Sequence, residues 1–321
     1  MNGITAAVLG SPIAHSLSPV LHTAGYHCLG IAATSSYSRC EVTEEELSDF
    51  LTAHPEHTGF SLTMPLKTEL VRMAAEAGWP ADDTAVQTGA ANTLIRHPAG
   101  QRIANTDVIG IVEAVSERLS EVSGERPVGE HPAGENPARE HPAGQPGPGR
   151  AALLGSGATA ASAVVALHRL GVAQLEIFAR RPERAAAAAE LAGRLGMESA
   201  VHPLAEFIPG AQPLTVSTLP GGALRPDSFS WSETVGAPAV LLDVAYADAG
   251  YSLGADFAAH GGQAISGQRM LIHQAVEQQL LFAAAAGIEA PAALWRPRLA
   301  AAMSAALSPD AASADTSGGP R

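Results

Sequence analysis

The chain has 321 residues, of which 46% are hydrophobic, 16% charged and 4% aromatic. This length suffices for two domains with separate cores, and the scarcity of aromatic residues leaves those cores to small aliphatic side chains, which suit helices packed on a parallel sheet. The formal net charge of −13 argues against a nucleic-acid partner, since binding a polyanion requires clustered Lys and Arg residues.

The beginning of the chain, residues 1–118, alternates strand-like and helix-like patterns. Such alternation predicts an α/β domain. Buried strands are expected at 5–9 and 60–63, and amphipathic helices at 44–53 and 68–77.

The next segment, residues 121–149, breaks this alternation. It reads EHPAG at 130–134, ENPAR at 135–139 and EHPAG again at 140–144, so that proline recurs every five residues. Such a composition supports neither helix nor sheet nor core, and we predict a disordered linker over 119–150. A motif that binds a partner is the alternative.

A second α/β unit is predicted over residues 151–268, and the chain ends in a solvated, disordered tail at 308–321. Strands are expected at 151–154, 175–178, 214–217 and 240–244, and helices from about 158 to 170, at 181–195, at 270–286 and at 292–306.

The cysteine usage and the hydropathy bear on location. Cys28 and Cys40 lie in no CxxC spacing and follow no secretory signal, which indicates reduced thiols in a cytoplasm and no metal site. No stretch approaches the roughly 18 uncharged apolar residues of a membrane span, so no membrane partner is expected. The oligomeric state is open, a homodimer included.

The glycine-rich stretch GSGATA at 155–160 follows a predicted strand and opens a predicted helix. Gly155 permits the tight turn, Gly157 lets the backbone approach a pyrophosphate, and Ala160 allows close packing of helix and strand. The free amides at the helix start face the phosphates. In this setting the stretch predicts a dinucleotide site, to which Ser156, Ala158 and Thr159 also contribute.

The end of the next strand discriminates between the two nicotinamide cofactors. An NAD enzyme places Asp or Glu there for the ribose 2′-hydroxyl, but this chain reads Ala179-Arg180-Arg181. Guanidinium groups bind a 2′-phosphate, which favours NADP. The alternative is two solvated arginines, although a helix start is an unfavourable place for unpaired positive charge.

Six stretches occur in a characteristic order and approximate spacing. They are GSPIAHSLSP at 10–19, SLTMPLK at 61–67, GAANT at 89–93, NTD at 105–107, the glycine-rich turn, and SGQRMLIHQ at 266–274. Taken together they resemble the shikimate dehydrogenase family, which includes shikimate and quinate dehydrogenases. The resemblance implies an α/β fold of two domains separated by a cleft. An N-terminal substrate domain, joined by the C-terminal helices at about 270–306, would face a Rossmann-type NADP-binding domain.

By this resemblance Ser16 and Ser18 bind the substrate carboxylate. Hydroxyls two residues apart in an extended segment share a face, so both can donate to one carboxylate. The alternative is a Ser-Pro turn with capping roles. Thr63, Asn92 and Asp107 are implied to bond the ring hydroxyls of the substrate, since such groups suit a polyol.

The resemblance also assigns proton transfer to Lys67. Hydride addition to a carbonyl develops an alkoxide, and an ammonium group beside it can act as general acid, or as base in the reverse direction. Asp107 would orient Lys67 as its pair.

Several weaker assignments also follow from the resemblance. Gln274 and Tyr246 would contact substrate, Val244 and Gly267 would lie near the nicotinamide, and Ser217-Thr218 would run beneath the cofactor. The sequence departs from the family pattern at 179–181, where Asn-Arg-Thr or Asn-Arg-Ser is usual, and after Tyr246, where the usual proline and threonine are missing.

The expected function is reversible, NADPH-dependent reduction of 3-dehydroshikimate to shikimate, a step of aromatic amino-acid biosynthesis. A quinate or amino-shikimate dehydrogenase using NAD remains an alternative, because nothing in the sequence fixes the pocket around the extra hydroxyl of quinate. A non-catalytic relative that binds ligand is a third possibility, against which the presence of both Lys67 and Asp107 speaks.

Overall fold

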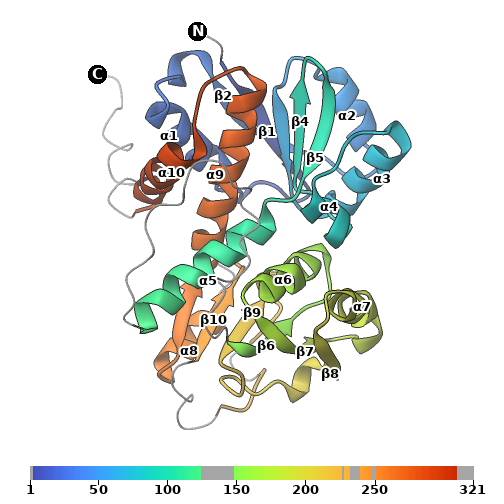
Figure 1. Cartoon of the computed structure of the whole chain (residues 1–321), viewed down its shortest axis with the longest axis vertical. Coiled ribbons are helices and arrows are strands. Elements are labelled where there is room, and N and C mark those ends of the chain that lie inside the picture. The colour runs from blue at the N-terminus through green and yellow to red at the C-terminus, as the bar shows by residue number, and fades with distance from the viewer. Residues whose placement is uncertain (1–2, 124–147, 226–227, 232–238, 247–250, 309–321) are drawn as a thin grey trace.

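A computed structural model describes residues 3–123, 148–225, 228–231, 239–246 and 251–308. It contains two β-sheets with helices packed around them, one sheet formed by the N-terminal part of the chain and the other by the part that follows (Figure 1). The predicted α/β class with two domains, the second of Rossmann type, is confirmed.

The first sheet has the strand order β2-β1-β3-β4-β5. Strands β1, β2 and β3 are parallel, whereas β4 and β5 form an antiparallel pair at the far edge. The predicted strands at 5–9 and 60–63 are present, each shifted at its ends by one residue. The strands are β1 (Thr5–Gly10), β2 (Ser36–Glu41), β3 (Gly59–Leu62), β4 (Thr93–His97) and β5 (Gly100–Ala104).

The helices of this part are α1 (Ser18–Cys28), α2 (Leu47–Ala53), α3 (Lys67–Ala77), α4 (Asp83–Thr88) and α5 (Asp107–Ser123), with a short 3-10 turn η1 (Ala32–Thr34). The predicted helix at 68–77 begins one residue earlier, at Lys67, and the one at 44–53 begins at Leu47.

The second sheet is fully parallel and has the order β11-β10-β9-β6-β7-β8. The first strand of this sheet, β6, lies at its centre; β7 and β8 follow on one side of it, and β9, β10 and β11 follow on the other. The strand order therefore reverses between β6 and β9, which makes this the topological switch point. Ligands of such sheets bind at the carboxyl ends of the strands there. The strands are β6 (Gly149–Leu154), β7 (Val172–Ala179), β8 (Glu198–Pro203), β9 (Leu214–Ser217), β10 (Val240–Asp243) and β11 (Gln263–Ser266).

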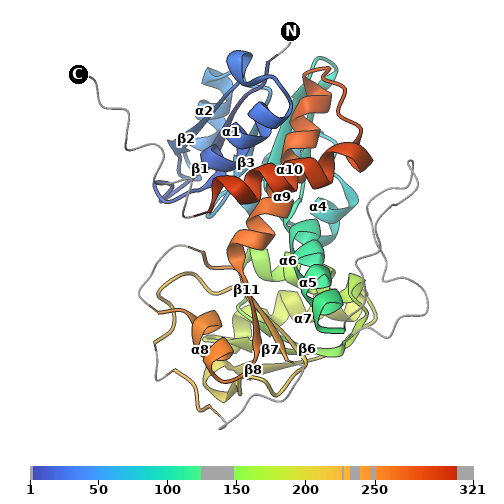
Figure 2. The ribbon, with the colours of Figure 1, turned by 90° about the vertical axis from the view of Figure 1, so that its left-hand side faces the viewer.

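The remaining helices are α6 (Ala158–Arg169), α7 (Ala186–Arg194), α8 (Leu253–Ala259), α9 (Gly267–Ala285) and α10 (Ala292–Ala306), with 3-10 turns η2 (Pro182–Ala185) and η3 (Leu204–Glu206). After β11, α9 leads the chain back to the first sheet, where α10 packs on α1 (Figure 2). Helix α5 runs between the two sheets and packs against α6 and α9.

The structure shifts three boundaries. Helix α5 continues to Ser123, so the domain boundary expected at 118 falls inside a helix. The helix belongs with the second sheet, because its apolar stripe of Val108, Ile111, Val112 and Val115 is buried in the core of that sheet. Strand β6 begins at Gly149, inside the expected linker. The helix expected at 181–195 is divided into η2 and α7. Residues 124–147 of the predicted linker and 309–321 of the predicted tail lie outside the described residues.

Small side chains allow helix α6 to pack closely on the second sheet. Ala160, Ala163 and Ala166 of α6 are completely buried. Because methyl groups at these positions let α6 approach β6 closely, the glycine-rich turn before α6 is held at the edge of the sheet.

Gly59 is a place where the backbone permits no side chain. A Cβ there would lie 2.4 Å from the Phe282 ring and 2.6 Å from the Leu94 carbonyl. Gly59→Ala should therefore lower the free energy of unfolding by about 1–3 kcal/mol or more, as overpacking does. Urea unfolding of both proteins measures it. Gly193→Ala is the matched control: a Cβ there meets nothing within 4 Å of the described atoms, and helix propensity gains up to about 1 kcal/mol.

His22 predicts a pH-dependent stability. It is completely buried between α1 and α9, with Nδ1 2.8 Å from the Gln279 side-chain oxygen, and burial lowers its pKa to about 4. As pH falls, His22 is protonated in the unfolded chain before it is protonated in the folded one. The free energy of unfolding is therefore highest above pH 6.5 and decreases as pH falls towards 4.

Because of this residue, we expect the free energy of unfolding of the wild type to be about 2 kcal/mol lower at pH 5 than at pH 7.5, as follows from the folded and unfolded pKa values of His22. Chemical unfolding of wild type and His22→Gln at both pH values measures the difference, since the carboxylates common to both cancel. Equal pH dependence in the two proteins would contradict the assignment.

Candidate active site

The predicted acid–base pair forms in the structure. Lys67 begins α3 and Asp107 begins α5, and Lys67 Nζ lies 2.5 Å from Asp107 Oδ2. Their side chains are 12% and 4% exposed. An ion pair removed from water to this degree costs desolvation energy, which is offset only when further hydrogen bonds satisfy the charges.

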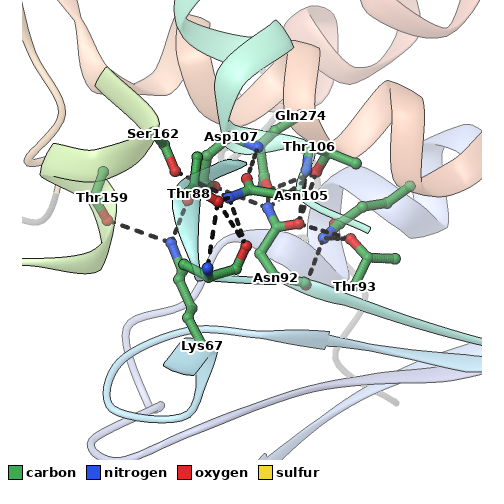
Figure 3. Close-up of polar contacts among 12 residues, drawn as sticks. Lys67, Thr88, Asn92, Thr93, Asn105, Thr106, Asp107, Thr159, Ser162 and Gln274 are labelled. Carbon is green, nitrogen blue, oxygen red and sulfur yellow. Dashed lines mark hydrogen bonds and ion pairs between the residues drawn. The ribbon is translucent and has the colours of Figure 1, made fainter. Parts of the chain in front are cut away.

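Asn92 supplies one of these bonds and gathers the neighbouring residues (Figure 3). Its Nδ2 lies 2.8 Å from Asp107 Oδ1, 2.9 Å from Gln274 Oε1 and 3.0 Å from Thr106 Oγ1. An amide carries two hydrogens, so three acceptors compete for them. Gln274 and Asp107 therefore keep acceptor capacity for a polyhydroxylated ligand. The structure thus brings together Lys67, Asn92, Asp107 and Gln274 from four separate parts of the chain.

Asn105 belongs to the NTD stretch at 105–107, but the sequence did not predict it as a site residue. Its Oδ1 accepts the backbone N–H of Asp107 at 3.0 Å, which fixes the start of α5. Its Nδ2 donates to the Ala90 carbonyl at 2.9 Å and to Ser162 Oγ at 3.1 Å, so it also joins the first sheet to α6. The signal that could have found it is the Asx turn implied by Asn two residues before Asp.

The glycine-rich turn has the geometry of a phosphate cradle. Gly155 adopts φ +118, and a Cβ there would lie 2.3 Å from Thr218 Oγ1. At Gly157, a Cβ would meet no described atom within 4 Å, so the backbone is open to a ligand, and α6 begins at the next residue. These features fit the pyrophosphate of a dinucleotide.

Thr159, in the first turn of α6, brings this cradle to the acid–base pair. Its Oγ1 accepts a hydrogen bond from Lys67 Nζ at 3.4 Å (Figure 3). The two predicted domains therefore touch where the cleft between them was expected, and Lys67 faces the cofactor side of the molecule.

The other predicted cofactor residues lie along the same edge. Ser217 and Thr218 end β9 beside the glycine-rich turn, and the Thr218 hydroxyl donates to the Leu154 carbonyl at 2.9 Å. Gly267 approaches β10 closely, since a Cβ would lie 2.4 Å from the Val244 carbonyl oxygen. Arg180 and Arg181 are exposed at the end of β7.

The conformation around the two serines differs from the expectation. Leu17 is helical (φ −87, ψ −4), and the Ser18 N–H donates to Ser16 Oγ at 3.3 Å. The expected extended segment is wrong, because Pro19 in the first turn of α1 favours a helix start. Ser16 closes a local turn with Ser18, but the N-cap residue of α1 is Leu17, which makes no side-chain cap bond. Both serines are buried (7% and 4% exposed). Their role as carboxylate ligands stays a prediction.

Two further predicted residues lie near the pair. Thr63 follows β3, and its side chain packs where a Gly10 side chain would be, 2.4 Å from such a Cβ. Tyr246 is half-buried; burial, and then the charge of Asp107, raises its pKa. The departing loop at 247–250 lies outside the described residues.

Lys67 is the only lysine in the sequence; every other permanent cation is arginine. Arginine holds its proton at all ordinary pH values, whereas lysine can release one. The composition thus contains an additional signal for proton transfer that the motif comparison did not use.

The described residues contain no group of three or more His, Cys, Asp or Glu side chains that could hold a metal ion. A helix of the length and apolarity needed to cross a membrane is likewise not found in the described part of the chain.

Comparison with known proteins agrees with this site. The family model of the shikimate dehydrogenase substrate binding domain matches residues 8–94. A shikimate dehydrogenase (NADP(+)) of Methylobacterium radiotolerans is 32% identical over 279 residues, which are 84% of this chain and 88% of that protein. The pentafunctional AROM polypeptide of Komagataella phaffii is 27% identical over 281 residues, 84% of this chain but 16% of that polypeptide.

Solved structures show the same likeness. Shikimate dehydrogenase of Mycobacterium tuberculosis superposes with a TM-score of 0.68 at 32% identity, covering 94% of this chain and 99% of that one. The Thermus thermophilus enzyme in complex with NADP(H) and shikimate gives 0.67 at 25% identity, covering 95% and 100%. Because identity above 30% extends over most of both sequences, the chain belongs to the shikimate dehydrogenase family.

Proposed function

We propose that the protein is an NADP-dependent shikimate dehydrogenase, which reversibly reduces 3-dehydroshikimate to shikimate in aromatic amino-acid biosynthesis. The observation that carries the proposal is the buried Lys67–Asp107 pair, 2.5 Å apart and in contact with Thr159 of the cofactor cradle. Its two free cysteines, Cys28 and Cys40, fit a cytoplasmic enzyme.

The residues that would hold the cofactor surround the switch point of the second sheet. When bound, NADPH supplies the hydride for the carbonyl carbon. The glycine-rich turn binds the pyrophosphate, the two arginines after β7 bind the 2′-phosphate, and the strand ends of β9 and β10 with the start of α9 lie along the nicotinamide side. The individual residues are Gly155, Ser156, Gly157, Ala158, Thr159, Arg180, Arg181, Ser217, Thr218, Val244 and Gly267.

On the substrate side, Lys67 donates a proton from Nζ to the oxygen that becomes the new hydroxyl, and takes one back in the reverse direction. Asp107 holds the ammonium in place. Asn92, with Gln274 and Thr63, presents donors and acceptors to the ring hydroxyls, while Tyr246 covers the substrate. Ser16 and Ser18 bind the carboxylate at the other end of the ring.

Replacement of Lys67 should separate binding from chemistry. Lys67→Ala and Lys67→Arg should both lower kcat by about 10²- to 10⁴-fold, because neither side chain can exchange the proton. Shikimate affinity, measured by equilibrium titration, should change by only a few-fold. Persisting turnover in either variant would show that another group donates the proton.

The arginines after β7 should set the cofactor. We expect Arg180→Ala and Arg181→Ala to raise KM for NADP by about tenfold or more, because a charge-assisted bond to the phosphate is lost, and to leave KM for NAD unchanged. Arg184→Ala, an exposed arginine one turn further along, is the control. Equal effects on both cofactors would contradict 2′-phosphate binding.

Steady-state rates with shikimate and quinate, each with NADP and NAD, test the activity as a whole. The proposal expects the highest kcat/KM for shikimate with NADP. A higher kcat/KM for quinate with NAD would show that the protein is instead a quinate dehydrogenase that uses NAD. If no combination of substrate and cofactor is turned over, the protein is a non-catalytic relative.

A further inference from the structure

Strand β2 was not predicted from the sequence, yet two of its side chains reach the residues at the predicted carboxylate end of the site. Tyr37 pairs in register with Ala6, and Arg39 with Val8. Residues two apart on a strand share a face, so both side chains lie on the same side of the sheet. Ser61 of β3 also pairs with Val8 and lies on that side.

Tyr37 connects two hydroxyl groups. Its phenol donates to Ser61 Oγ at 2.6 Å, and the Ser18 side chain is near enough to lower the pKa of the same phenol. Burial raises the Tyr37 pKa, so the phenol remains a neutral donor. The ring stacks on His22, with centroids 4.1 Å apart and planes 4° from parallel, which fixes its orientation.

From Ser61 the hydrogen bonds continue towards the acid–base pair. Ser61 Oγ donates to Gln278 Oε1 at 2.9 Å, and Gln278 Nε2 donates to the Asn92 carbonyl at 3.1 Å. Tyr37 is therefore the outer member of a row that ends at Asn92, which itself contacts Asp107.

Arg39 acts on the other serine. Its Nε donates to the Ser16 carbonyl at 2.8 Å, which brings a positive charge to the turn. The charge of Lys67 is already paired with Asp107. Within the described part of the chain, Arg39 thus places beside this turn a positive charge that a substrate carboxylate can use.

We propose that β2 builds the carboxylate end of the substrate pocket. Tyr37 orients the Ser18 and Ser61 hydroxyls, and Arg39 fixes the Ser16 backbone and places a positive charge beside the substrate carboxylate. Both are positioning residues, and the inference rests on the proposed function.

Steady-state kinetics of wild type, Tyr37→Phe and Arg39→Gln test this, with shikimate and with its uncharged methyl ester. Phe keeps the ring on His22. Each variant should raise KM for shikimate about 5- to 20-fold, as loss of one hydrogen bond or charge contact does, with kcat within about twofold and KM for NADP unchanged. With the ester, Arg39→Gln should match the wild type.

Tyr26→Phe is the matched control, because it removes the hydroxyl of a buried tyrosine that donates instead to the Ser36 carbonyl. Its KM for shikimate should stay at the wild-type value. The β2 proposal is overturned if the wild type turns over shikimate but Tyr37→Phe and Arg39→Gln keep its KM, or lose kcat instead. A wild type that does not turn over shikimate with NADP overturns the proposed function itself.

Discussion

The structure depends most on the buried ion pair of Lys67 and Asp107. Two charges at this depth are stable only when their remaining hydrogen-bonding capacity is filled, and the surrounding chain fills it: Asn92 Nδ2 bonds the second Asp107 oxygen, and Asn105 fixes the Asp107 backbone. The pair therefore requires that the loops after β3 and β5 and the residue just before β4 meet at one point. That requirement aligns the first sheet with α5 and, through α5, with the second sheet.

The same pair links chemistry to the cofactor side. Helix α5 starts at Asp107 and packs against α6, the helix that begins at the glycine-rich turn. Thr159 contacts Lys67 directly, and Ser162 contacts Asn105. A shift of α6 relative to the first sheet would therefore disturb Lys67, the proposed proton donor, as well as the glycine-rich turn proposed to bind the cofactor, and positioning errors of this kind are costly to catalysis.

The opposite end of the site is organised by neutral groups rather than by an ion pair. The Tyr37 hydroxyl donates to Ser61 Oγ, and Ser16 Oγ accepts the Ser18 backbone N–H; hydroxyl groups of this kind can both donate and accept. Such groups bind an anion without the desolvation cost of a buried counter-charge, and the exposed Arg39 supplies positive charge from the edge. The two ends of the site thus differ in charge: one holds the Lys67–Asp107 ion pair and the other is lined by hydroxyl groups, and we propose the latter for the substrate carboxylate.

The sequence by itself determined the α/β class, the strands at the centre of both sheets, the glycine-rich turn of a dinucleotide site and the group of Lys67, Asn92, Asp107 and Gln274. These features depend on local patterns: apolar runs, glycines that need particular backbone angles, and short motifs. Only the tertiary structure decided the role of Asn105, the helical start at Ser18 and the existence of β2. Strand β2 reads SYSRCE, a polar edge strand without an apolar run. It becomes recognisable as a strand only in the fold, where it pairs with β1, and β1 in turn pairs with β3.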